Sequence, residues 1–146
     1  MIITKSIHID APSDVVWAVT RDVERWPEWT PTVTSVRLAD DRELGPGSVA
    51  RIKQPMQPES EWVVTEFRDG ERFAWETRRP GLHMVGTHEL AAAGTGTRNV
   101  LTLEATGVIA VIFRPLLGWA VRKALADENR GLKVRCEQES SAGAEL

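Results

Sequence analysis

The chain has 146 residues, close to the size of one domain, and it can bury a core without a disulfide or a metal ion. Its 18 basic and 21 acidic side chains give a formal charge of -3 without a single-sign block, which argues against a nucleic-acid partner. The single cysteine cannot form an intramolecular disulfide, and the longest apolar run, 107–113, is too short for a transmembrane segment. The N-terminus has no signal pattern, so we predict a cytoplasmic protein.

The N-terminal part predicts one strand followed by two short helices. Residues 1–9 alternate isoleucine with polar side chains, which is typical of a half-buried strand. Pro12 suits the first turn of a helix, and valines then recur at helical spacing over 12–21. A second short helical segment is expected over 24–29, where Pro27 interrupts it.

From residue 32 onward, a two-residue period and turn residues replace the helical pattern. Asp69-Gly70 is a strong hairpin signal, and similar glycine and proline turns separate the other runs of strand length. Consecutive antiparallel strands are therefore expected over 32–39, 48–54, 60–67, 72–79, 82–91 and 97–106. Together with the first strand they make a seven-stranded sheet.

Residues 108–139 predict a long helix that Pro115 kinks or restarts, because the following apolar residues fall near one stripe: Leu117, Val121, Leu125 and Leu132. The tail 139–146 has too few apolar residues to pack, so we expect one domain over 1–138 and a frayed end. This order of elements indicates an α+β fold in which a curved antiparallel sheet wraps around the long helix. A cavity lined by apolar and aromatic side chains remains wherever the helix does not fill the concave face.

Several motifs follow one another in a specific order. Ile9-Asp10-Ala11-Pro12-Ser13-Asp14-Val15-Val16-Trp17 precedes Asp22-Val23-Glu24-Arg25-Trp26-Pro27-Glu28-Trp29, and the later motifs are Gly45-Pro46-Gly47, Phe73-Ala74-Trp75, Gly94-Thr95-Gly96-Thr97 and Glu128-Asn129-Arg130-Gly131-Leu132-Lys133. Over nearly the whole chain, this series resembles the polyketide cyclase/dehydrase group of the START-like, helix-grip superfamily, also called SRPBCC. The resemblance implies a helix-grip fold with a cavity for lipids, polyketides, hormones or similar molecules. It implies no particular reaction, because its motifs are mainly fold motifs.

Nine residues are candidates for lining such a cavity: Trp29, Trp62, Trp75, Met84, His88, Leu101, Phe113, Leu117 and Val121. Flat aromatic rings add contact area with little loss of entropy. Ordinary core packing explains any one of the aromatic residues at least as well. Trp119 differs, since it falls beside Arg122 and Lys123 on the more polar side of the helix, where it suits a sheet edge or a partner interface.

The histidines argue against a metal site and offer one candidate for acid-base chemistry. His83 and His88 lie five residues apart on one expected strand, which sends their side chains to opposite faces, so we predict no metal site. The segment 94–99 lacks the final glycine of a dinucleotide fingerprint and leads into a strand, so we predict no cofactor either. His88 shares a face with Met84, Gly86 and Leu90, where it could orient a ligand oxygen or move a proton. A hydrogen-bonded structural histidine is the more common case.

Two functions from different classes follow. The first is binding or carriage of a small hydrophobic ligand, such as a lipid, a polyketide or an aromatic molecule, between the sheet and the C-terminal helix. The alternative is a polyketide cyclase/dehydrase-like enzyme acting on a substrate in the same cavity, with His88 or an inward carboxylate moving protons. An interaction module with a filled interior is a third hypothesis, and the oligomeric state, a homodimer included, stays open.

Overall fold

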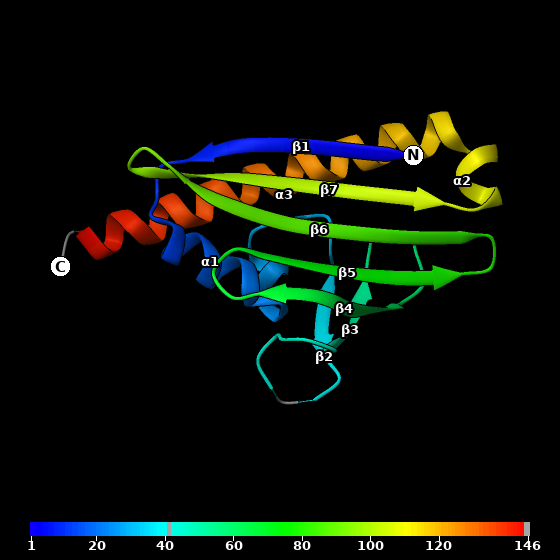
Figure 1. Ribbon diagram of the computed structural model, residues 1–146, viewed down its shortest axis with the longest axis horizontal. Coiled ribbons are helices and arrows are strands. Elements are labelled where there is room, and N and C mark those ends of the chain that lie inside the picture. The colour runs from blue at the N-terminus through cyan, green and yellow to red at the C-terminus, as the bar shows by residue number, and fades with distance from the viewer. Residues whose placement is uncertain (41, 145–146) are drawn as a thin grey trace.

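The computed structural model describes residues 1–40 and 42–144 (Figure 1). In this described part, seven antiparallel strands form one curved sheet in the order β1-β7-β6-β5-β4-β3-β2. The strands are β1 Ile2–Ile9, β2 Ser35–Leu38, β3 Val49–Lys53, β4 Ser60–Arg68, β5 Arg72–Arg79, β6 Leu82–Ala93 and β7 Gly96–Thr106. Every neighbouring pair except β1 and β7 is consecutive in the chain, so hairpins and short connections build the sheet.

Four helical segments complete the architecture of the described residues: α1 Ser13–Arg21, the 3-10 helix η1 Val23–Glu28, α2 Val108–Ile112 and α3 Arg114–Ala144. The long helix α3 crosses one face of the sheet and packs on β1 and β7, while α1 contacts α3 and η1 lies against β2 (Figure 1). This arrangement confirms the predicted α+β helix-grip fold. None of the helices within the described ranges has the length and hydropathy that a membrane span requires.

The start of β2 and the end of α3 differ by three residues or more from the sequence-based prediction. Strand β2 begins at Ser35 instead of residue 32, because Thr30 and Thr32 bond to each other through their hydroxyls over 2.9 Å in a turn. Helix α3 continues through Ala144, past the expected fraying point, and Arg135 supports this last part by donating to Glu139 one turn further on over 3.0 Å.

The break between the two C-terminal helices lies where proline predicts it. Pro115 occupies the first turn of α3, where a missing backbone N–H leaves no intrahelical bond unmade. Helix α2 ends at Ile112, and the intervening Phe113 still donates its N–H to the carbonyl of Ile109 over 3.0 Å. The chain therefore turns from β7 through one short helix into the long one.

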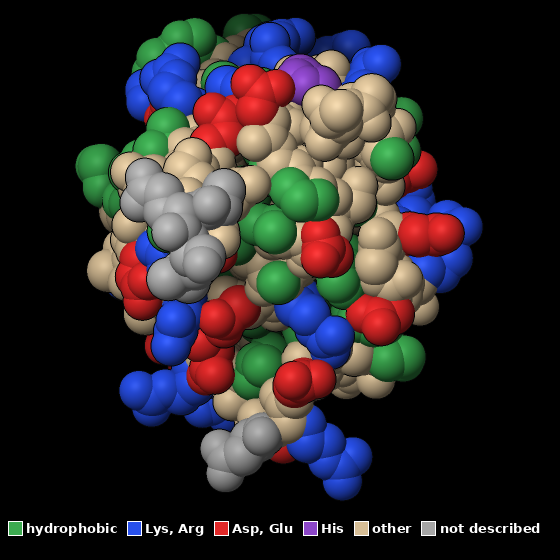
Figure 2. Space-filling model, turned by 90° about the vertical axis from the view of Figure 1, so that its left-hand side faces the viewer, with side chains coloured by type: hydrophobic (Ala, Val, Ile, Leu, Met, Phe, Trp, Pro, Cys, Tyr) green, Lys and Arg blue, Asp and Glu red, His purple; other side chains and the backbone are tan. Residues whose placement is uncertain are grey.

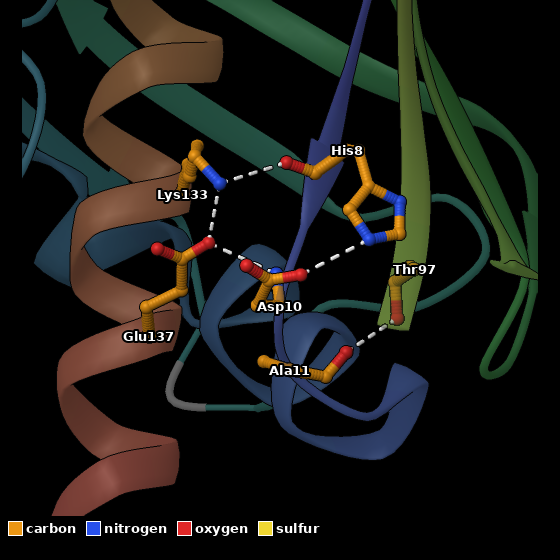
Figure 3. A network of polar contacts seen from close by, with 6 residues as sticks. All are labelled: His8, Asp10, Ala11, Thr97, Lys133 and Glu137. Atoms are coloured by element: carbon orange, nitrogen blue, oxygen red, sulfur yellow. Dashed lines mark hydrogen bonds and ion pairs between the residues drawn. The ribbon is translucent and has the colours of Figure 1, made fainter. Parts of the chain in front are cut away.

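A polar network fastens the C-terminal half of α3 to the connection between β1 and α1 (Figure 3). Lys133 donates to the backbone carbonyl of His8 over 3.0 Å, and the backbone N–H of Asp10 donates to the Glu137 carboxylate over 2.9 Å. Thr97 on β7 donates its hydroxyl proton to the carbonyl of Ala11 over 2.8 Å. These bonds hold one half of the helix close to the sheet.

Candidate ligand-binding cavity

A cavity of about 320 Å³ lies between the sheet and the N-terminal half of α3. This volume is at the lower end of the range for small-molecule sites. Its sheet wall includes Trp62, Trp75, Leu82, Met84, Gly86, His88, Leu101 and Leu103, and its helix wall includes Leu117, Ala120, Val121, Ala124, Leu125 and Glu128. Trp26, Thr32, Val33, Ile52, Gln54 and Gln57 close the end beside η1 and β3.

Strand periodicity and a small residue together shape the sheet wall. Along β6 the buried positions are Met84, Gly86, His88 and Leu90, the face that the sequence pattern groups together. A Cβ on Gly86 would lie 3.2 Å from the indole Nε1 of Trp75, so the absence of a side chain lets that ring lie across the neighbouring strand. The outer face of β6 instead carries His83, whose Nε2 lies 2.8 Å from the Glu76 carboxylate.

His88 and Glu128 form a buried polar pair in the mainly apolar cavity. His88 on β6 points its Nδ1 at Oε1 of Glu128 on α3 over 3.5 Å, and only 9% and 12% of the two side chains are exposed. Oε1 of Glu128 is buried without a hydrogen-bond partner among the described residues. A buried carboxyl oxygen without a partner can form a hydrogen bond with a polar atom of a ligand.

Aromatic rings surround the imidazole of His88. Phe73 stacks on it with a centroid separation of 4.5 Å and an interplanar angle of 12°. Trp26 lies at 5.0 Å, and Trp75 approaches edge-on at 5.8 Å. These rings exclude water from the imidazole and fix its orientation, so burial dominates its electrostatics.

Desolvation shifts both groups of the pair toward their uncharged forms. Burial lowers the pKa of His88 from 6.5 to about 3 and raises the pKa of Glu128 from 4.5 to about 8. Attraction between an imidazolium and a carboxylate would oppose both shifts, but the 3.5 Å separation is too long for a strong bond. At neutral pH the pair therefore holds a neutral imidazole and a protonated carboxyl group, which can donate a hydrogen bond.

The structure brings together seven of the nine residues proposed from the sequence as cavity lining: Trp62, Trp75, Met84, His88, Leu101, Leu117 and Val121. Trp29 does not line the cavity, because the chain has left η1 at that residue and its backbone carbonyl abuts Gly131 of α3. Phe113 does not line it either. It lies at the break between α2 and α3 with half of its surface in solvent.

Two important cavity residues were missing from that set. Trp26 lies three residues before Trp29 and takes the place expected for it. Glu128 belongs to the motif 128–133 of the family resemblance, which indicates the fold and not the cavity. It lies three residues after Leu125 on the apolar stripe of α3. An acidic residue on an otherwise apolar helical stripe is the signal that identifies it.

A second hollow of about 490 Å³ lies on the outer side of α3, lined by residues such as Trp29, Asp127, Arg130 and Arg135. It is more open to solvent than the cavity under α3 and has less apolar lining, since Glu28, Asp127, Arg130 and Arg135 form part of its wall. Among the described residues, no three His, Cys, Asp or Glu side chains lie close enough together to hold a metal ion. The more enclosed and more apolar cavity between the sheet and α3 is therefore the candidate site.

The family model for polyketide cyclase / dehydrase and lipid transport matches residues 1–137. Among solved structures, a protein from Thermus thermophilus has a TM-score of 0.77 at 21% identity, covering 96% of this chain and 99% of that one. An aromatase/cyclase from a Streptomyces species has a TM-score of 0.75 at 19% identity, covering 94% of each chain. A START superfamily protein from Mycobacterium smegmatis has a TM-score of 0.70 at 16% identity, covering 94% of this chain and 97% of that one.

No protein with a curated description matches the sequence. At these identities the solved structures establish the fold alone. The family model spans all seven strands and most of α3. The chain belongs to the polyketide cyclase / dehydrase and lipid transport family.

Proposed function

We propose that the protein binds or carries a small hydrophobic molecule in the cavity between the sheet and α3. The observation that carries this proposal is a partly enclosed hollow of about 320 Å³ whose walls are mainly aromatic and aliphatic. Moving an apolar molecule from water into such a site is favourable by roughly 25 cal/mol per Å² of buried surface. The family description, which includes lipid transport, supports the same class of ligand.

The polar pair narrows the ligand class that the cavity suits. A protonated Glu128 donates a hydrogen bond, so a carbonyl, ether or hydroxyl oxygen on an otherwise apolar molecule would satisfy it. A purely hydrocarbon ligand would leave the carboxyl group without a partner, which costs about 1–3 kcal/mol. We therefore favour a hydrophobic molecule with one oxygen function, as found in lipids, polyketides and aromatic compounds.

Ligand-dependent stabilisation tests the proposal. The purified chain is screened by thermal unfolding against fatty acids, sterols, aromatic polyketides and their hydrocarbon analogues, and hits are checked by native mass spectrometry. A ligand bound only by the folded state at 100 times its Kd stabilises by about 2.7 kcal/mol, which raises Tm by several degrees. We expect oxygen-bearing members to exceed their hydrocarbon analogues. Absence of any shift or bound mass across the panel would contradict the proposal.

The His88–Glu128 pair favours one second candidate, an enzyme of the cyclase or dehydrase type. A dehydration step needs a base that removes a carbon-bound proton and an acid that protonates the departing hydroxyl group as water. A neutral His88 and a protonated Glu128 are the two required states, and a proton passing from the imidazolium to the carboxylate would restore both. The lowered pKa of His88 makes it a feeble base, however, so we rank carriage above catalysis.

Turnover separates the two candidates. His88→Gln and Glu128→Gln are compared with the wild type for affinity and for conversion of any ligand found in the screen. An enzyme would lose turnover by a factor of about 100 or more with each substitution, and affinity would change less. A carrier would show no conversion in any variant, because its bound molecule leaves unchanged.

A further inference from the structure

One end of the molecule exposes an unusual concentration of large apolar side chains. We call it the apolar end, and it comprises Val108, Val111, Ile112, Phe113, Leu116 and Trp119 on α2 and the first turns of α3 (Figure 1). Each is between 51% and 75% exposed, and these residues are six of the ten exposed large hydrophobic side chains among the described residues. Isolated exposed apolar residues are ordinary, but a cluster of this kind marks an interaction surface.

Basic side chains outnumber acidic ones around the apolar end. The segment 105–126 contains Arg114, Arg122 and Lys123, although the whole chain carries a formal charge of -3. Lys123 forms an ion pair with Asp127 over 2.8 Å, so the net positive charge of this segment comes from Arg114 and Arg122. The turn between β5 and β6 packs against α2, where Ile109 donates its N–H to the carbonyl of Gly81 over 2.9 Å. Arg78 and Arg79 precede this turn. Arg78 lies 3.9 Å from the Glu76 carboxylate, so Arg79 is the one that adds to the positive charge at this end.

The opposite end provides a contrast. Figure 2 shows acidic and basic side chains interspersed there, with apolar side chains scattered among them. Such a surface has no single-sign field and no continuous apolar face. The opposite end therefore lacks the combination of clustered apolar side chains and excess basic charge found at the α2 end.

We propose that the apolar end docks on the surface of an anionic phospholipid membrane. Helices that lie in the membrane interface combine Trp, Phe and Leu side chains with Lys and Arg, and attraction to anionic lipids adds to the apolar burial. The long side chains of Arg114 and Arg122 can reach outward to phosphate groups while their stems stay on the apolar surface. This inference stands on the surface alone and does not depend on the ligand of the cavity.

A membrane fits this surface better than a second copy of the chain. A two-fold symmetric dimer through the apolar end would bring Arg114 and Arg122 close to the same two cations of the partner copy, which is unfavourable. The docked orientation also has a functional consequence, because Ala120 lines the cavity and is itself exposed. Leu116 lies one helical turn before Ala120, so docking would bring an opening of the cavity near the lipid.

Vesicle flotation tests the proposal directly. The purified chain is mixed with vesicles of phosphatidylcholine alone or with about 30% phosphatidylglycerol added, in about 50 mM or about 500 mM salt. We expect partition into the anionic vesicles at low salt, with at least a tenfold loss in neutral vesicles and a comparable loss at high salt. Failure to bind the anionic vesicles at low salt would overturn the proposal, whatever the cavity binds.

Matched variants locate the surface. Val111→Asp should lower the partition coefficient at least tenfold, and Val134→Asp, also an exposed valine in a C-terminal helix but outside the apolar end, should not. Neutralising Arg114 and Arg122 together with glutamine should lower it about 25-fold, because each cation contributes about a factor of five, and Arg130→Gln is the control. Circular dichroism and melting verify that the variants fold. Equal losses in variants and controls would contradict the assignment, as would a dimer in solution that Val111→Asp dissociates.

Discussion

Glu128 and His88 meet across 3.5 Å between the helix wall and the sheet wall of the cavity. A neutral imidazole beside a carboxyl group and an imidazolium beside a carboxylate hold the same single proton. Burial disfavours the charged arrangement, and this is why the two pKa values move apart in opposite directions, to about 3 and about 8. A pair of this kind makes the stability of the fold depend on pH in a way that can be calculated.

We predict that Glu128 makes the protein less stable as pH rises from 4.5 to 8. In this window the unfolded chain has lost the Glu128 proton and the folded chain retains it, so the folded state binds more protons and the free energy of unfolding falls. Relative to Glu128→Gln, the wild type should lose up to about 1.4 kcal/mol per pH unit. Urea unfolding of both proteins at pH 5, 6, 7 and 8 measures this difference.

His88 contributes with the opposite sign in a lower window. Between pH 3 and 6.5 the unfolded chain binds a proton on this imidazole that the folded chain does not, so His88 contributes stability that is lost on acidification. The two contributions cancel between about pH 4.5 and 6.5, where the pair binds one proton in both states.

The control for the Glu128→Gln comparison is Glu104→Gln, which makes the same exchange on the exposed outer surface of β7. If the difference in free energy of unfolding between the wild type and Glu128→Gln were constant from pH 5 to 8, the uncharged state of the His88–Glu128 pair would be refuted.

A substitution that fills the cavity should abolish ligand uptake while the fold persists. Ala124 on α3 lines the cavity, so Ala124→Phe places a ring in the space that a ligand would occupy. We expect affinity for any ligand from the screen to fall at least tenfold, as measured by titration calorimetry. Ala126→Phe changes the same residue type on the same helix outside the cavity and should retain affinity. Similar losses in both variants would place the binding site elsewhere.

The hydrogen bond between Asn99 on β7 and Asn129 on α3 should show unequal sensitivity at its two ends. Asn99 donates to Oδ1 of Asn129 over 2.8 Å, and Asn129 in turn donates to the carbonyl of Lys5 over 3.2 Å. Asn129→Ala leaves a buried donor and a carbonyl without partners, which costs about 2 kcal/mol or more. Asn99→Ala also removes an Oδ1 that is already unsatisfied, so its cost should be smaller. Urea unfolding of both variants checks the order, and a reversed order would contradict this account.

The sheet and the long helix could be predicted from local patterns because periodicity and turn residues act over a few positions. Alternation along β6 correctly placed Met84, Gly86 and His88 on one buried face. The neighbouring tryptophans could not be placed in this way. Trp26 and Trp29 are three residues apart and would share a face in a continuous helix, but η1 ends at Glu28 and the chain turns Trp29 toward α3.

The polar pair required the fold as well as the pattern. His88 and Glu128 are 40 positions apart in the sequence, and the helix pattern alone does not show which strand its apolar stripe will face. Phe113 is the converse case: its hydrophobicity suggested a cavity residue, but the break between α2 and α3 at this position determines where its ring points. Tertiary packing therefore decides membership in the site, while the sequence decides which residues are available for it.

The contact between α3 and the residue after η1 leads to a last prediction. For a Gly-to-Ala substitution at this contact, helix propensity raises the free energy of unfolding and packing lowers it. A Cβ on Gly131 would lie 1.9 Å from the backbone carbonyl oxygen of Trp29, whereas a Cβ on Gly143 of the same helix meets nothing within 4 Å. Alanine is favoured over glycine in a helix by about 1 kcal/mol, so Gly143→Ala should be neutral or slightly stabilising. Gly131→Ala should instead destabilise by at least about 2 kcal/mol, because the backbone of α3 or of Trp29 must move. Urea unfolding compares the two, and a stabilising Gly131→Ala would show that the helix does not pack this closely on η1.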